Sequence, residues 1–215
     1  MCVDYQLLRR EASNPLYDCV REYPYELLVP FHNDLNLQER AHELAKGLRR
    51  ELLFQVGPFL CCKSPASHIG PYRYAVDFLV PDGTVVCAAD MGRVEEIVTS
   101  SDIWGPSPEF ADHLNFITIA HHTWRTHHHS GPPEYHYWTQ YCHLARGSER
   151  EFDIHVGDHV SAGQPIARTG KTGWTSCDHL HFMAFMSDDG RGAFGFMSLK
   201  PRFNVRHWQE QSHDG

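Results

Sequence analysis

Two histidines that lie two residues apart in an apolar run are the clearest sign of chemistry in this sequence. They belong to the stretch Asp178-His179-Leu180-His181-Phe182. In a β-strand, residues i and i+2 point to the same face, so both imidazoles would face one site. The spacing alone leaves three roles open. Both rings could bind one metal, one could bind a metal while the other moves a proton, or both could be ordinary surface histidines.

Three side chains upstream could complete a metal site. A hydrolytic zinc needs three nitrogen or oxygen ligands and one open position, where bound water becomes a nucleophile near neutral pH. His181 can supply one nitrogen, and His68 lies just before a predicted strand. Asp77 lies inside that strand, where a buried carboxylate needs a partner such as a metal. His143 lies in a further short strand. Each of the three also fits an ordinary role, in a loop, in a salt bridge or at the edge of the core.

Short strands are the elements that would position these residues. From residue 59 onward, β-branched or aromatic runs alternate with Gly, Pro, Asp and Asn, which is typical of a mainly β, mostly antiparallel domain. Residues 81–83 and 90–92 predict tight turns, and residues 156–164 predict a hairpin of the barrel-sandwich kind. The predicted strands cover residues 74–80, 84–88, 93–99, 115–120, 141–144, 165–169 and 179–186.

The remaining segments differ in pattern from the β domain. Residues 1–34 are punctuated by prolines, and apolar residues at helical spacing then predict one amphipathic helix over 37–54. In residues 121–140 the apolar residues follow neither a helical nor a strand period, which predicts an insert between two strands. This His-rich insert could line a groove, bind a second metal or be a surface loop. We therefore divide the chain into an N-terminal segment, residues 1–56, a β domain, residues 57–205, and a tail, residues 206–215.

The composition excludes several classes of function. The 215 residues are 41% hydrophobic, which suits one globular domain. The formal net charge is −8, and the sequence has no cluster of basic residues that could bind a phosphate backbone, so nucleic acid is not an expected partner. No run approaches the roughly 20 apolar residues of a membrane span, and the first residues do not look like an export leader. The seven cysteines are an odd number without C-x-x-C spacing, so we expect reduced thiols.

Four motifs, in this order, resemble the LytM/lysostaphin-type zinc metallopeptidases over residues 65–186. The motifs are His68 with Asp77, the run Tyr141-Cys142-His143-Leu144, the segment from Gly157 to Gln164, and His179-Leu180-His181-Phe182. The resemblance implies an antiparallel peptidase domain that binds one Zn²⁺ through His68, Asp77 and His181. It also implies that His143 and His179 are catalytic, one as general base and the other as hydrogen-bond donor to the oxyanion, in an order left open.

The same resemblance implies the activity and the partner. It implies a zinc metalloendopeptidase that hydrolyses peptidoglycan peptides, either in Gly-rich cross-bridges or between D-Ala and the diamino acid of a stem. Such a substrate lies outside the cytoplasm. Because the chain shows no export leader, we leave the location open between extracytoplasmic and cytoplasmic. The sequence does not indicate an oligomeric state.

Two local features depart from the pattern of the family. Asp77 comes nine residues after His68, a longer spacing than the family usually has. Cys177 lies two residues before His179, where the family tends to have Gly-Pro. Its thiol could bind or inhibit the metal, or it could touch nothing of importance.

Other functions fit the sequence less well. A non-hydrolytic LytM-like domain that binds cell wall or regulates a partner would usually lack ligands, whereas this chain retains them. An iron oxygenase normally has its His and carboxylate ligands two residues apart. A lipoyl, biotinyl or sugar-phosphotransfer domain would leave the carboxylate without a role, and the first two need a modified lysine at a hairpin tip.

Overall fold

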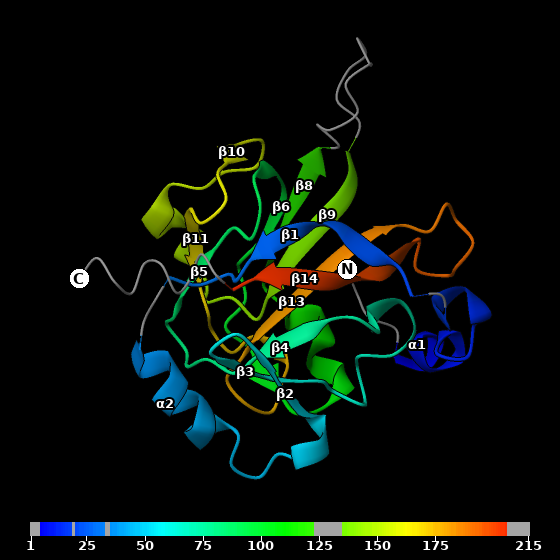
Figure 1. Ribbon diagram of the computed structural model, residues 1–215, viewed down its shortest axis with the longest axis horizontal. Helices are drawn as coiled ribbons and strands as arrows, with labels where there is room; N and C mark the ends of the chain where they lie inside the picture. The colour runs from blue at the N-terminus through cyan, green and yellow to red at the C-terminus, as the bar shows by residue number, and fades with distance from the viewer. Residues whose placement is uncertain (1–4, 19, 33–34, 123–134, 206–215) are drawn as a thin grey trace.

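The computed structural model describes residues 5–18, 20–32, 35–122 and 135–205 (Figure 1). It confirms the predicted mainly β, antiparallel fold. The described residues also form two short α-helices, α1 (Tyr5–Glu11) and α2 (Leu35–Leu44). Short 3-10 helices connect the strands, among them η3 (Gly70–Tyr72) and η4 (Pro108–His113). The strands are β1 (Glu22–Leu28), β2 (Leu53–Val56), β3 (Phe59–Cys62), β4 (Val76–Phe78), β5 (Val85–Cys87), β6 (Gly92–Val98), β7 (Trp104–Gly105), β8 (Phe116–His122), β9 (Tyr135–Cys142), β10 (His159–Val160), β11 (Pro165–Arg168), β12 (Gly173–Trp174), β13 (Leu180–Ser187) and β14 (Phe196–Asn204).

One large sheet carries most of the described strands. Its order is β10-β6-β8-β9-β13-β4-β3-β2, and all neighbours along this path are antiparallel. Strand β14 adds to β13, and β1 lies parallel to β14, so an N-terminal strand joins the sheet through a C-terminal one (Figure 1). Two smaller sheets pair β11 with β5 and β12 with β7.

Alternation along the central strands separates a core face from a second face of the large sheet. On β13, Leu180, Phe182 and Ala184 belong to the main hydrophobic core. Because side chains alternate along a strand, His181 and Met183 point to the opposite face. We call that opposite face the site face. The core face is completed by neighbouring strands, with Phe78, Ile117, Ile119 and Tyr141.

The strand register places four distant residues in one row across the site face. Phe116 is the partner of Cys142, Cys142 is the partner of His181, and His181 is the partner of Asp77. Directly opposed side chains on one face of an antiparallel sheet lie about 4.5–5.5 Å apart at Cβ. The register alone therefore brings Asp77 of β4 against His181 of β13.

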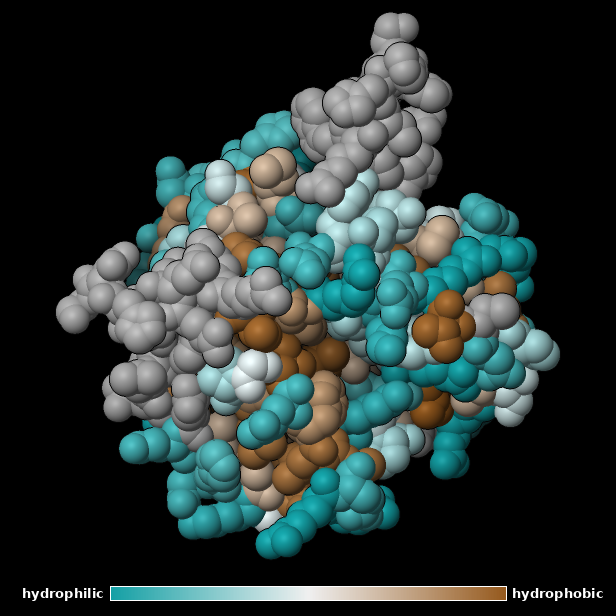
Figure 2. Space-filling view, in the orientation of Figure 1, coloured by the Kyte–Doolittle hydropathy of each residue, from teal (hydrophilic) through white to brown (hydrophobic). Residues whose placement is uncertain are grey.

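The N-terminal part differs from its prediction. The helix predicted over 37–54 ends at Leu44, and Gly47 follows with φ of +90°, a left-handed conformation that glycine adopts without strain. Residues 53–56 then form β2, and β1 lies in the part predicted to be irregular. The boundary at residue 56 stays a prediction. Figure 2 shows apolar residues gathered between α2 and the β2–β3 pair, where Ala41, Cys62 and Leu79 pack together.

Two predicted loops also change. Strand β8 runs to His122 and β9 begins at Tyr135, so the insert predicted over 121–140 is shorter, and its residues 123–134 lie outside the described residues. The segment 156–164 is not a hairpin that pairs with itself, because β10 pairs with β6 and β11 pairs with β5. None of the helices in the described ranges is long and apolar enough to cross a membrane.

Candidate metal centre

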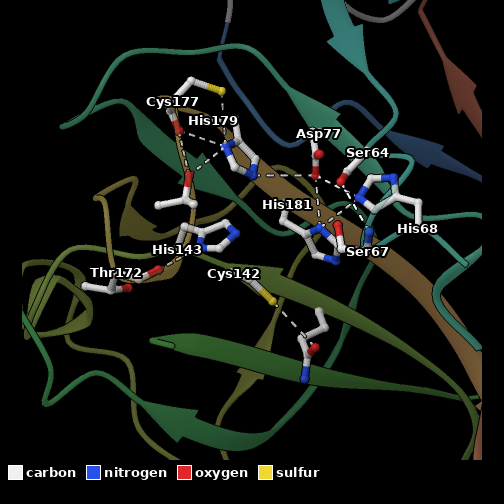
Figure 3. Close-up of polar contacts among 12 residues, drawn as sticks. Ser64, Ser67, His68, Asp77, Cys142, His143, Thr172, Cys177, His179 and His181 are labelled. Carbon is white, nitrogen blue, oxygen red and sulfur yellow. Dashed lines mark hydrogen bonds and ion pairs between the residues drawn. The ribbon is translucent and has the colours of Figure 1, made fainter. Parts of the chain in front are cut away.

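His68, Asp77 and His181 meet at one point on the site face (Figure 3). Nδ1 of His181 lies 2.9 Å from Oδ1 of Asp77, and Nε2 of His68 lies 3.1 Å from the same oxygen. The two ring nitrogens lie 3.2 Å from each other. His68 and Asp77 are buried. The structure thus brings together the three side chains predicted to bind the metal.

These three side chains fit a zinc ion by chemistry and by spacing. Zinc is bound by imidazole nitrogens and carboxylate oxygens at about 2.0–2.2 Å, which places tetrahedral ligand atoms roughly 3.3 Å apart. The three observed separations lie within a few tenths of an ångström of that value. Nδ1 of His68 is buried without a hydrogen-bond partner among the described residues, so the ring makes its polar contacts through Nε2. Three ligands leave one position for water.

A turn between His68 and Asp77 explains their long spacing in sequence. At η3 the N–H groups of Tyr72 and Arg73 donate to the carbonyls of Ile69 and Gly70, both at 3.1 Å, and Gly70 adopts a φ of +53°. This compact turn takes up the additional residues before Asp77 enters β4. The nine-residue gap therefore still brings His68 against Asp77.

His179 and His143 lie beside His68, Asp77 and His181. Nε2 of His179 lies 3.6 Å from Oδ1 of Asp77, and the His143 and His179 ring centroids are 4.6 Å apart. Strand β13 begins only at Leu180, yet the predicted pair does face one site, because His179 and His181 both approach the Asp77 carboxylate (Figure 3).

Backbone carbonyls fix the same tautomer in both of these rings. Nδ1 of His143 lies 2.6 Å from the carbonyl of Thr172, and Nδ1 of His179 lies 2.9 Å from the carbonyl of Cys177. A carbonyl only accepts, so each Nδ1 must carry the hydrogen and donate it. The Nε2 atom of each ring is then left for the site.

His143 does not lie in a strand, in contrast to the prediction for residues 141–144. Strand β9 ends at Cys142, and His143 adopts a left-handed backbone with φ of 62°. Its carbonyl accepts from the N–H of Gly170 at 2.7 Å. Such a conformation is costly for a non-glycine residue and is found mainly where the surroundings enforce it. The sequence analysis missed this supporting loop, although Gly170 and Gly173 could have indicated a close approach of two backbones.

The charges of the site favour different protonation states for its members. Burial opposes ionisation of Asp77, but the surrounding imidazoles of His68, His179 and His181 hold its pKa well below the usual range. Burial and the rings of His179 and His181 hold the pKa of His143 well below its ordinary value. Burial also opposes the positive charge of His179. The Asp77 carboxylate and the side chain and backbone carbonyl of Cys177 nevertheless raise the pKa of His179 to about 9. Asp77 is thus held as an anion, and His143 is held in its neutral form.

The Cys177 thiol is not part of the metal-binding group formed by His68, Asp77 and His181. Its Sγ lies 3.9 Å from Nδ1 of His179, on the side of the ring that already bonds to a carbonyl. The neighbouring Asp178 forms an ion pair with Lys171 at 2.9 Å. Both contacts hold the loop that carries His179.

His121, from the predicted insert, lies away from this centre. It is buried in β8, where Nδ1 is 2.8 Å from the carbonyl of Met91 and Nε2 is 2.8 Å from Oγ1 of Thr139. Both ring nitrogens of His121 therefore make hydrogen bonds to neighbouring residues of the sheet. The three alternatives for the insert, a groove lining, a second metal site or a surface loop, stay untested, because its remaining histidines fall partly outside the described residues.

Comparison with known proteins identifies a family model and several relatives. The model described as peptidase family M23 matches residues 71–190. Lysostaphin from Staphylococcus simulans is 28% identical over 118 residues, which make up 55% of this chain and 19% of that protein. The glycyl-glycine endopeptidase ALE-1 from Staphylococcus capitis is 31% identical over 113 residues, which make up 53% of this chain and 24% of that protein. The chain thus spans less than a quarter of the length of either relative.

Solved structures similar to this chain include the catalytic domain of the antimicrobial peptidase lysostaphin from Staphylococcus simulans. The match has a TM-score of 0.39 and 26% identity, and it covers 58% of this chain and 74% of that one. A zinc-containing peptidase from Vibrio cholerae matches with a TM-score of 0.37 and 25% identity, over 57% of this chain and 29% of that one.

Proposed function

Because the chain belongs to peptidase family M23, we propose that it is a zinc-dependent endopeptidase that hydrolyses peptide bonds of peptidoglycan. The observation that carries the proposal is the meeting of His68, Asp77 and His181 within hydrogen-bond distance of one another. The names of the relatives, a lysostaphin and a glycyl-glycine endopeptidase, support peptide hydrolysis as the reaction. Its substrate would place the enzyme outside the cytoplasm.

In this proposal the three ligand atoms are Nε2 of His68, Oδ1 of Asp77 and Nδ1 of His181. When bound, zinc lowers the pKa of a coordinated water to about 7 and polarises the carbonyl of the substrate. The anionic Asp77 offsets part of the positive charge of the ion, and the two neutral imidazoles complete the set. Burial of His68 and Asp77 limits competition by bulk water for these atoms.

His143 and His179 are the catalytic residues of the proposal. Their Nδ1 hydrogens are held by the carbonyls of Thr172 and Cys177, so each ring presents Nε2 to the reacting atoms. One Nε2 accepts the proton of the attacking water and later delivers it to the leaving amine. The other donates a hydrogen bond to the oxygen that becomes negative as the tetrahedral intermediate forms.

Metal analysis combined with turnover tests this function. The purified chain should hold one zinc per molecule and release soluble fragments from purified peptidoglycan. Asp77→Asn and His181→Ala should lose zinc and activity together, whereas His143→Ala and His179→Ala should keep zinc and lose about 10²- to 10⁴-fold in turnover. His155→Ala, at an exposed histidine away from the centre, is the matched control. Full activity of zinc-free His181→Ala would refute the proposal.

The non-hydrolytic alternative has a distinct outcome in the same experiment. A binding or regulatory domain would sediment with peptidoglycan without releasing fragments, with or without zinc. No feature of the described residues favours it, because the ligands and both additional imidazoles converge on one point.

A further inference from the structure

A cavity opens directly beside the candidate metal centre. Its volume is about 110 Å³, and its lining includes His143 and His181. A peptide whose scissile bond reaches these two rings would therefore place a neighbouring side chain in the cavity. We call this cavity the apolar pocket, and its other lining residues used below are Leu8, Gln140, Met183, Phe185 and Phe196.

The pocket is a continuation of the site face of the sheet. Met183 and Phe185 follow His181 at intervals of two along β13, so they point to the same side. The ring of Phe185 contacts that of Phe196 with centroids 5.5 Å apart. Leu8 of α1 forms a further wall and is almost completely buried. Strands and a helix thus build apolar walls beside the metal ligand.

The chemistry of the lining selects the side chain that can occupy the pocket. None of the described residues around it is Asp, Glu, Lys or Arg. Gln140 is its main amide, and its Nε2 donates to Oγ1 of Thr118 at 3.1 Å while its Oε1 accepts from the Cys142 thiol. A charged side chain would lose its hydration here without gaining a partner, which is costly. Glycine would leave the apolar walls unfilled.

The volume of the pocket further limits which substrate side chains can occupy it. An engineered apolar cavity of about 150 Å³ accommodates benzene, so this smaller cavity suits an aliphatic side chain of the size of leucine or methionine. Filling or emptying such a pocket changes kcat/KM by about 10- to 200-fold for each methylene or small group gained or lost.

We propose that the apolar pocket is a specificity site that accepts an uncharged aliphatic side chain, such as Leu or Met, next to the scissile bond. This inference rests on the endopeptidase activity of the proposed function and extends it beyond peptidoglycan, to peptides with a bulky apolar residue at the cleaved bond. The Gly-rich and diamino-acid peptides that the resemblance implies stay substrates in this proposal, but the charge-free lining makes their side chains less favourable occupants of the pocket.

A matched peptide series tests the proposal. The substrates are acetyl-Gly-Gly-Xaa-Gly-Gly-amides with Gly, Leu, Met, Lys or Glu at Xaa. Cleavage by the zinc-loaded full chain is followed by mass spectrometry, and binding to zinc-loaded His179→Ala is followed by calorimetry. We expect the Leu and Met peptides to be bound and cut beside Xaa at least tenfold better than the Gly, Lys and Glu peptides. Equal or better binding and cleavage of the Gly or Lys peptide would overturn the proposal.

The two readouts separate this proposal from the proposed function. If the Leu peptide is bound preferentially but neither peptides nor peptidoglycan are cut, the pocket stands and the endopeptidase proposal fails. If all peptides are cut equally, the endopeptidase stands and the pocket proposal fails.

A near-isosteric change of charge provides a second test. Gln140→Glu keeps the volume of the side chain and places an anion in the pocket. The preference for Leu over Lys should fall at least tenfold, because a lysine side chain gains a partner and an aliphatic one meets a charge. Gln55→Glu makes the same change at an exposed position of β2 and should leave the preference unchanged. An unchanged preference in folded Gln140→Glu would show that this side chain does not face the bound substrate, and the proposal would be wrong.

Discussion

The left-handed backbone of His143 leads to a prediction about stability that is independent of catalysis. At φ of 62°, a residue with a Cβ is strained by roughly 1–2 kcal/mol. Glycine avoids this strain but loses more conformational entropy on folding, about 0.5–1 kcal/mol. His143→Gly and His143→Ala remove the same imidazole and the same hydrogen bond to Thr172. Their difference therefore isolates the backbone, and we expect the Gly variant to be more stable by about 0.5–1 kcal/mol.

Equilibrium unfolding in urea measures this difference on chelator-treated protein, so that zinc binding does not contribute. The same pair of substitutions at His155 provides the control. His155 is exposed and is not among the residues with positive φ, so the order should reverse, with Ala more stable than Gly. If His143→Ala is as stable as His143→Gly, while the control pair behaves as expected, the strain assigned to position 143 is absent.

Two further changes test the surroundings of the centre. Cys177→Ser should leave the zinc content unchanged, because the thiol lies outside the group of ligand atoms, and a large loss of zinc in metal analysis would identify it as a ligand. Gly170→Ala should lower the free energy of unfolding by about 1–3 kcal/mol, because its Cβ would lie 2.6 Å from the backbone N and Cα of Ala145. It should also lower turnover, since the Gly170 N–H supports the carbonyl of His143. Wild-type stability in urea unfolding would show that the adjoining backbone yields without cost.

Local patterns in the sequence predicted the strands that carry the ligands. The alternation around His179-Leu180-His181-Phe182 predicts a strand over 179–186, and β13 covers Leu180–Ser187. The apolar run around Asp77 likewise contains β4. The roles of the five site residues came from the resemblance to a family. The structure brings all five together, but their roles stay a prediction until zinc binding and turnover are measured.

Non-local contacts explain what the sequence did not indicate. Strand β1 is stabilised by its pairing with β14. Its Tyr23, Tyr25 and Leu27 do alternate with polar residues, but Pro24 in the same run counts against a strand when the sequence is taken alone. The predicted helix ends early because Gly47 adopts a positive φ and the following residues pack as β2 against β3. His143 resembles a strand residue in sequence, but the carbonyls and N–H groups of the loop around Gly170 decide its conformation.

The order of the ligands along the chain has a consequence for synthesis. His181 lies 113 residues after His68 and 104 residues after Asp77. Translation at about 5–20 residues per second separates the first two ligands from the third by on the order of ten seconds. During that interval the nascent chain presents an incomplete ligand set and, until β14 follows, an unpaired β1. Under the proposed function, zinc-dependent hydrolysis therefore begins only after nearly all of the sheet has been made.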